Sequence, residues 1–139
     1  MFERLLMRRN MDLVRLILLK IEDEYRSTAI FNIDIPGYDM ETVAYHCKIL
    51  NEAGLISAYN AQYGSNELMC FAVGPLTWDG NEYLDKVRDD SQWAKVKNVI
   101  ISKGVPLAID TIKSVSDAFV TAATEGIVNS IIKNTGILP

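Results

Sequence analysis

Residues 40–73 read METVAYHCKILNEAGLISAYNAQYGSNELMCFAV, and this stretch decides the fold. Its first half predicts a helix over 40–53, which Asp39 can cap and which Gly54 ends, because glycine readily adopts left-handed backbone. Its second half holds two short runs of alternating apolar and polar residues on either side of Gly64-Ser65-Asn66, a combination typical of a β-hairpin. The predicted apolar face of the helix comprises Met40, Val43, Ala44, Cys47, Ile49 and Leu50.

The residues before this stretch add a helix and a short strand. The segment MDLVRLILLKIEDE (11–24) predicts an amphipathic helix, with Asn10 or Asp12 near its start as the cap. The segment FNIDIP alternates briefly and then meets Pro36-Gly37, so we expect a strand at about 31–35. The inward residues of the helix follow the i, i+3, i+4, i+7 spacing and are Val14, Ile17, Leu18 and Ile21.

This order of elements predicts an α+β fold with a winged helix-turn-helix-like core. A helix, a short strand, a helix ending in Ala-Gly-Leu-Ile and a hairpin follow one another, and in that arrangement the helix before the hairpin is the recognition element. There is one departure from the pattern. Only residues 36–39 separate the strand from the second helix, so the usual middle helix is missing or reduced to a turn.

Two further helices are predicted after the hairpin. Thr77 can cap a helix over 78–89 that carries Leu84 and Val87 inward, and Asp90 or Ser91 can cap another over 92–102. Aromatic residues bury large areas more often than they bind ligands. We therefore expect the two tryptophans that flank the first of these helices to anchor it to the core; they are Trp78 and Trp93.

The remainder of the chain predicts one long apolar helix. Pro106 is tolerated in a first helical turn, and the helix then runs to about Asn134. A helix of about 28 residues is roughly 42 Å long, more than a domain of this size easily shields. We expect it to mediate homo-oligomerisation; the alternative is that it kinks near Gly126 and folds back over its own core. The oligomerisation residues are predicted to be Ile112, Val115, Phe119, Ile127 and Ile131.

Length and composition limit the domain organisation and the classes of function. The 139 residues predict one compact domain over 1–104 with an appended helix over 105–139. The net charge is −4, which argues against a protein held to nucleic acid by phosphate charge alone. The N-terminus lacks the pattern of a secretory signal, and no run of about 18 uninterrupted apolar residues predicts a membrane span. A cytoplasmic location is therefore expected.

No sequence pattern points to a metal, a cofactor or catalysis. One histidine and two cysteines are too few for a closed zinc site, and phosphate-binding glycine loops and the common hydrolase motifs are absent. His46 and Cys47 are neighbours in a helix and point about 100° apart, so they do not form a nucleophile pair. The acidic residues near Asp85 alternate with Lys86 and Arg88, as on a solvated helix end. We therefore expect no enzyme and no cofactor.

Three ordered blocks resemble a known family. The segments MDLVRLILLKIE (11–22), YHCKILNEAGLI (45–56) and LTWDGNEYLDKVRDDSQWAKVK (76–97) are similar to the signature blocks of a bacterial domain-of-unknown-function family that is often found in phages and prophages. The second block also resembles the end of recognition helices in small winged-helix repressors, with Cys47 where an aliphatic residue is usual. The resemblance implies a phage or prophage setting, and it provides no established activity or catalytic residue to carry over to this chain.

The predicted recognition helix and wing carry little positive charge. Over 40–70 the only basic residue is Lys48, against three glutamates. We therefore expect a non-enzymatic interaction or assembly module, whose protein-contacting residues are predicted to be Tyr45, Lys48, Tyr59 and Tyr63. The alternative is a winged-helix transcriptional regulator, in which a dimer brings two N-terminal basic clusters to DNA. Its candidate nucleic-acid contacts are Arg4, Arg8, Arg9 and Arg15.

Overall fold

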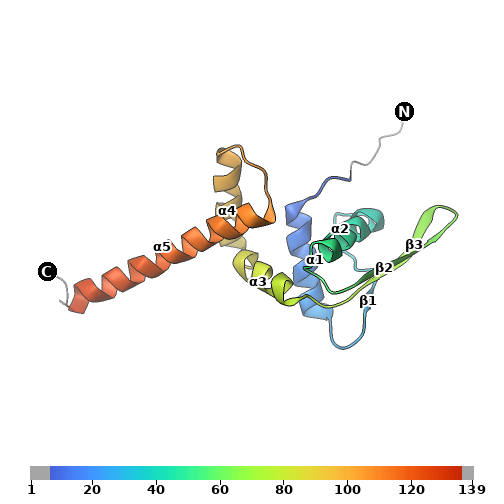
Figure 1. The fold of residues 1–139 in the computed structure, drawn as a ribbon, viewed down its shortest axis with the longest axis horizontal. Coiled ribbons are helices and arrows are strands. Elements are labelled where there is room, and N and C mark those ends of the chain that lie inside the picture. The colour runs from blue at the N-terminus through green and yellow to red at the C-terminus, as the bar shows by residue number, and fades with distance from the viewer. Residues whose placement is uncertain (1–6, 136–139) are drawn as a thin grey trace. The chain divides into compact units, whose positions relative to one another are not determined.

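A computed structural model describes the backbone of residues 7–135 and the side chains of residues 7–122. The fold is mixed α+β: over these residues it holds five helices and a small three-stranded antiparallel sheet (Figure 1). Contacts divide the chain into two compact units, Met1–Arg88 (unit 1) and Asp89–Pro139 (unit 2). The division therefore falls at Arg88/Asp89, whereas the sequence placed it after residue 104.

Helix α1 (Met11–Glu24) forms the centre of unit 1. The Asn10 side chain caps it by accepting hydrogen bonds from the backbone N–H groups of Asp12 and Leu13, at 2.9 and 3.2 Å. A side-chain oxygen at this position satisfies N–H groups that have no partner within the helix. The apolar face is buried as predicted, and its members Val14, Ile17, Leu18 and Ile21 are at most 1% exposed.

Strand β1 (Ile30–Phe31) is shorter than the strand predicted at 31–35. Asn32 adopts left-handed backbone with φ 51, which ends the strand. Its backbone N–H still donates to the Phe71 carbonyl at 2.8 Å, and its side-chain oxygen accepts a hydrogen bond from the Phe71 N–H at 2.9 Å, so the side chain replaces the backbone carbonyl in this pair. The segment from Asn32 to Asp39 contains a turn and no helix, which confirms that a middle helix is missing or reduced to a turn.

Helix α2 (Met40–Glu52) follows, with the caps that the sequence predicts. Asp39 accepts a hydrogen bond from the Thr42 N–H at 2.7 Å, and Gly54 has the left-handed φ of 78° after the last turn. The prediction was wrong for Met40, which is 37% exposed because the first helical position lies at the edge of the buried face. The buried face consists of Val43, Ala44, His46, Cys47 and Leu50.

The predicted hairpin is present as β2 (Tyr59–Gly64) and β3 (Glu67–Val73), in a sheet of order β1-β3-β2. Ser65 and Asn66 both have positive φ, of 52° and 67°, as a two-residue hairpin loop requires. The register shifts by one residue at Gln62/Tyr63, where Met69 is the extra residue of β3. Alternation along β2 places Tyr59, Ala61 and Tyr63 on the face toward α2, and Asn60 and Gln62 on the outer face.

Helix α3 (Trp78–Val87) is joined to the end of α2 through its cap. Thr77 accepts a hydrogen bond from the Gly80 N–H, while its own N–H and hydroxyl donate to the carbonyl groups of Leu55 and Gly54. Tyr83, Leu84 and Val87 are fully buried and hold the helix in unit 1. The anchoring role predicted for Trp78 is wrong: its side chain is 79% exposed, because the first position of α3 points away from this contact.

Unit 2 contains helices α4 (Asp90–Ser102) and α5 (Ile109–Thr135). Asp89 caps α4, one residue before the caps that the sequence favoured, and the buried face of the helix consists of Trp93, Val96 and Ile100. Helix α5 begins at Ile109, so Pro106 lies three residues before the helix and not in its first turn, as the sequence had predicted. The Gln92 side chain donates to the Ser116 hydroxyl at 3.1 Å, which links the two helices. No helix among the described residues has the length and hydropathy needed to cross a bilayer.

Candidate functional site

The structure brings all four predicted protein-contacting residues to one pocket of unit 1. Tyr45 and Lys48 reach it from α2, and Tyr59 and Tyr63 reach it from β2. We call this the tyrosine pocket; its volume is about 250 Å³. The remaining lining residues are Met7, Glu41, Ala44, Asn66 and Leu68.

Periodicity explains why these side chains meet. Glu41, Tyr45 and Lys48 are spaced by four and three residues along α2, so they share one helical face. Tyr59 and Tyr63 are four residues apart in β2 and share one face of the sheet. The sequence predicted the three tyrosines and Lys48 as contact residues but not Glu41. Glu41 precedes Lys48 by seven residues, or two helical turns, and this spacing places both on one face of the helix.

The tyrosine pocket is amphipathic and carries one charge of each sign. Glu41 and Lys48 are both exposed and lie two helical turns apart, and Lys48 has no ion pair with any residue that the structure describes. Burial raises the pKa of Tyr59 to about 12, with a further contribution from neighbouring Tyr63. The Tyr59 phenol therefore keeps its proton at neutral pH and can donate a hydrogen bond.

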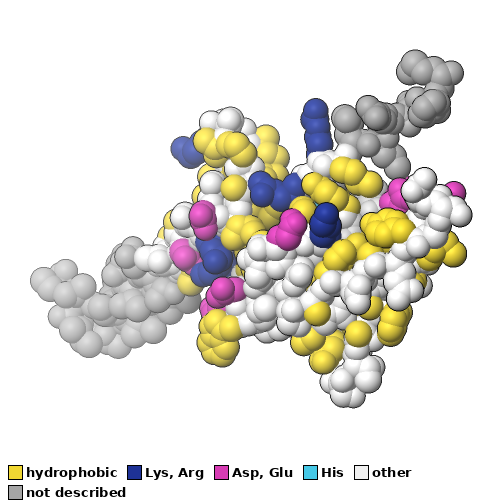
Figure 2. Space-filling model, turned by 45° about the vertical axis from the view of Figure 1, so that its right-hand side comes forward, with side chains coloured by type: hydrophobic (Ala, Val, Ile, Leu, Met, Phe, Trp, Pro, Cys, Tyr) yellow, Lys and Arg dark blue, Asp and Glu magenta, His cyan; other side chains and the backbone are white. Residues whose placement is uncertain are grey.

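The face that would meet DNA in a winged-helix protein is acidic. On α2 and the hairpin, Lys48 is accompanied by the exposed carboxylates Glu41, Glu52 and Glu67. Figure 2 shows basic and acidic side chains interspersed among the described residues in that view. The α2 and hairpin face, with one cation and three carboxylates, therefore offers few contacts to phosphates.

The N-terminal arginines take different positions. Arg8 and Arg9 are exposed just before α1, and Arg4 lies outside the described residues. Arg15 is only 7% exposed: its Nε and Nη2 atoms donate to the carbonyl oxygens of Val87 and Arg88, at 2.6 and 2.7 Å. The prediction that Arg15 contacts nucleic acid is therefore wrong, because its guanidinium closes the C-terminal end of α3 inside unit 1.

His46 and Cys47 have structural positions inside unit 1. The His46 Nε2 atom accepts a hydrogen bond from the Asn10 N–H at 2.8 Å, so its Nδ1 carries the proton and donates to the Thr42 carbonyl, also at 2.8 Å. Cys47 is fully buried, and desolvation raises the pKa of its thiol to about 12. Neither group is available as a nucleophile or base at the surface.

The acidic residues near Asp85 take part in an ion-pair network. Arg88 contacts the carboxylates of both Glu22 and Asp85, which joins the end of α3 to α1. The Arg88 contact lowers the pKa of Glu22. The described residues contain no group of three or more histidine, cysteine, aspartate or glutamate side chains that could hold a metal ion.

The predicted oligomerisation residues divide into three groups. Ile112 is fully buried within unit 2, so its side chain is not available to another chain. Val115 and Phe119 are half-buried and line an open apolar groove of about 410 Å³ with Val99, Ser114, Ala118 and Ala122. Ile127 and Ile131 lie on α5, but their side chains are outside the described residues.

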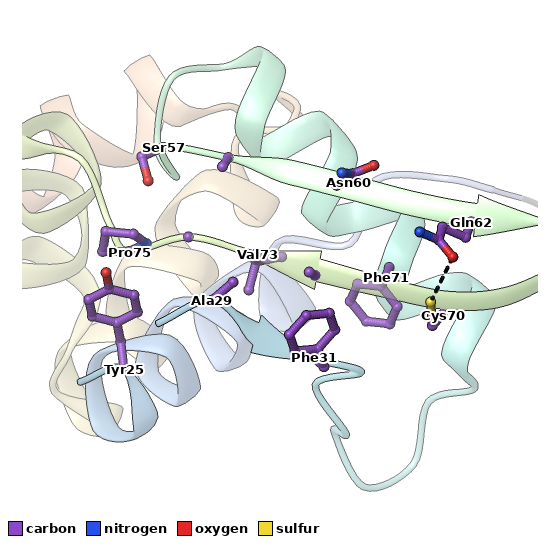
Figure 3. A pocket seen from close by; sticks show the side chains of 13 residues that line it. Tyr25, Ala29, Phe31, Ser57, Asn60, Gln62, Cys70, Phe71, Val73 and Pro75 are labelled. Carbon is purple, nitrogen blue, oxygen red and sulfur yellow. Dashed lines mark hydrogen bonds between the residues drawn. The ribbon is translucent and has the colours of Figure 1, made fainter. Parts of the chain in front are cut away.

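A second pocket of unit 1, which sequence reasoning missed, lies on the outer face of the sheet. Its volume is about 510 Å³, and Figure 3 shows Tyr25 and Pro75 at one end and Gln62 and Cys70 at the other. We call it the outer-face pocket. The alternation of Asn60 and Gln62 with the tyrosines of β2 was the available signal, because it places these amides on the face opposite the tyrosine pocket.

Comparisons with known proteins agree with the three sequence blocks. Residues 8–106 match the family described as "Hypothetical protein (DUF2513)". A Haemophilus influenzae protein named "Uncharacterized protein" is 42% identical over 116 residues, which are 83% of this chain and 97% of that protein. No solved structure matches the chain. The family match covers most of the chain and the relative is similar along nearly its whole length, so the chain belongs to the DUF2513 family.

Proposed function

We propose that the chain is a non-enzymatic assembly module that acts in the cytoplasm, in a phage or prophage setting, through a winged-helix-like core. The order of α1, β1, α2 and the hairpin, together with the sheet order β1-β3-β2, supports the winged-helix-like description. The phage or prophage setting rests on the sequence resemblance alone. The proposed mechanism is surface complementarity: unit 1 contacts a protein partner, and unit 2 contacts a second copy of the chain.

The observation that carries this proposal is the charge of the α2 and hairpin face. Proteins that bind specific DNA sites make on the order of 6–10 phosphate contacts. On this face Lys48 is the single cation, and Glu41, Glu52 and Glu67 would repel phosphates. A protein partner imposes no such demand, because protein interfaces are depleted in charge and enriched in tyrosine.

The tyrosine pocket supplies the contact chemistry. Tyrosine buries a large ring at low cost in side-chain freedom and keeps a hydroxyl for hydrogen bonding, which is why it is common at interaction hot spots. Tyr63 is 67% exposed and would lose most of that exposure beneath a partner. Lys48 and Glu41, on the same helical face, would set the orientation of the bound segment.

Unit 2 supports self-association. A pair of helices buries one face of each against the other, and the groove lined by Val115 and Phe119 stays open. Val120 and Ile101 are 53% and 61% exposed, which adds apolar surface on the same two helices. A second copy, related by two-fold symmetry, would cover this surface with the same residues.

A DNA-binding transcriptional regulator is the second candidate. Arg8 and Arg9 favour it, because they are exposed and directly follow Met7, which lines the tyrosine pocket beside α2. In a dimer, two such clusters could reach a duplex. The proposal then requires that most phosphate contacts come from the segment before α1 rather than from the recognition helix.

A fluorescence anisotropy titration against random duplex DNA separates the two candidates. The assembly module predicts no binding at about 50 mM salt, where phosphate contacts are strongest. Micromolar binding that weakens steeply with added salt would establish the regulator instead. The double variant Arg8→Gln/Arg9→Gln is the control, because loss of phosphate contacts should flatten the salt dependence of any binding observed.

A further inference from the structure

The outer-face pocket has the dimensions of a small-molecule site. Ligand pockets typically enclose about 300–1,000 Å³. The outer-face pocket, at about 510 Å³, falls within that range, and the tyrosine pocket, at about 250 Å³, falls below it. A protein interface would need about 800 Å² of surface on each partner, much more than one bounded pocket provides. A small molecule is therefore the occupant that the size favours.

The walls of the outer-face pocket carry no charged side chain. All thirteen residues that line it are described, and none is lysine, arginine, histidine, aspartate or glutamate. A charged ligand would lose hydration without gaining an opposite charge, which is costly, whereas an uncharged apolar ligand gains from leaving water. We propose that this pocket binds a small, uncharged molecule with an apolar or aromatic body.

Phe31 and two amides supply the contacts. The Phe31 ring is 67% exposed on the short edge strand β1, so a ligand placed against it buries aromatic surface. Asn60 and Gln62 lie two residues apart in β2 and point to the same outer face (Figure 3). Each amide can both donate and accept a hydrogen bond, so together they can hold one polar group of a ligand while its apolar body lies against Phe31.

Cys70 provides a readout within the pocket itself. Its thiol is half-buried at the pocket wall, where it contacts the Gln62 side-chain oxygen at 3.9 Å. Cys47 is fully buried with a pKa of about 12, so an uncharged disulfide reagent such as 4,4′-dithiodipyridine should modify Cys70 alone in the folded protein. A ligand in the pocket must then slow this reaction.

The test uses two fluorescent probes with similar aromatic rings. N-phenylnaphthylamine is uncharged, and anilinonaphthalene sulfonate adds a negative charge. We expect the uncharged probe, at saturation, to slow the modification of Cys70 by about tenfold, and the slowing should follow the occupancy of the pocket. The sulfonate should slow the modification much less. Phe31→Ala should raise the concentration of the uncharged probe that gives half-maximal protection about tenfold, as loss of an aromatic contact does.

Controls make every outcome decisive. Met69→Ala removes another exposed apolar side chain, 61% exposed in the same sheet but outside the pocket lining, and should leave the protection unchanged. Probe fluorescence without protection of Cys70 would place binding elsewhere and overturn the proposal. Equal protection by the sulfonate would overturn the preference for an uncharged ligand, and no protection by either probe would overturn the site.

Discussion

The contact between α3 and the end of α2 depends on Gly80. A Cβ atom added at this position would lie 2.0 Å from the Leu55 carbonyl oxygen, far inside the contact distance of real side chains. The neighbouring Thr77 donates two hydrogen bonds to this segment, to the carbonyl oxygens of Gly54 and Leu55, and these hold the start of α3 close to Leu55.

Gly80→Ala is therefore expected to destabilise unit 1 strongly. We expect the free energy of unfolding to fall by at least about 2 kcal/mol, because the backbone of α3 must shift away from Leu55. Chemical denaturation measures this change. Glu82→Ala, an exposed position on the same helix, is the control and should change stability by less than about 0.5 kcal/mol. Equal stability of the two variants would show that the close approach is not rigid.

Cys47 predicts a specific loss of stability at alkaline pH. Its thiol has a pKa of about 12 in the folded protein, against 9.0 when unperturbed. Above pH 9 the unfolded chain loses this proton while the folded chain keeps it, so the free energy of unfolding falls as pH rises toward 12. One proton contributes a slope of up to about 1.4 kcal/mol per pH unit.

Comparison with Cys47→Ala isolates this slope. The variant lacks the thiol but retains the buried tyrosines, so their titration cancels in the difference between the two proteins. Denaturation curves between pH 8 and about 10.5 should show stability falling more steeply for the wild-type chain. Parallel pH dependences would mean that the Cys47 thiol ionises as easily in the folded chain as in the unfolded one.

At the scale of elements, the helices follow from local signals and the rest follows from tertiary contacts. The spacing of apolar residues and the caps Asn10, Asp39 and Thr77 predicted α1, α2 and α3 closely, because these signals act within one or two turns. The length of β1 could not be predicted in this way. It is set by Asn32, whose side chain pairs with Phe71, a residue 39 positions away.

The candidate site shows the same division. Helical and strand periodicity brought Tyr45, Lys48, Tyr59 and Tyr63 to one pocket, since each pair lies on one face of its own element. Arg15 was misassigned because its partners, the last carbonyls of α3, become neighbours only after folding. The exposure of Trp78 was also not predictable from local signals. Tryptophan is usually buried, but the contacts of Thr77 and Gly80 with the end of α2 fix the orientation of α3 and leave Trp78 exposed.

The hairpin loop gives an element-scale prediction. Ser65 and Asn66 both adopt positive φ, which costs a residue with a side chain about 1 kcal/mol relative to glycine. The double variant Ser65→Asn/Asn66→Gly should raise the free energy of unfolding by about 0.5–1 kcal/mol, because Asn-Gly is the preferred pair for this loop. Thermal denaturation measures the gain.

A glycine placed elsewhere in the hairpin is the matched control. Ala61 lies inside β2, where glycine has no conformational advantage, so Ala61→Gly should lower stability by about 0.5–1 kcal/mol. A stabilising effect from both changes would show that the loop conformation is not the cause.

At the scale of the whole molecule, the two units have different surfaces. Unit 1 has a core centred on α1 and two pockets on opposite faces of its sheet, one amphipathic and one uncharged. Unit 2 leaves an apolar groove open along the described part of α4 and α5. An assembly module needs both a contact site for a partner and a surface for self-association, and the proposal assigns one to each unit.

Self-association is the most direct test of the assembly proposal, and sedimentation velocity at micromolar concentration measures it. We expect the wild-type chain to sediment as a dimer or larger species. Phe119→Asp places a charge in the open groove and should shift the chain to monomer, whereas Asp117→Asn, an exposed neighbour on α5, should leave the assembly intact. A wild-type chain that sediments only as a monomer throughout the micromolar range would contradict the proposal.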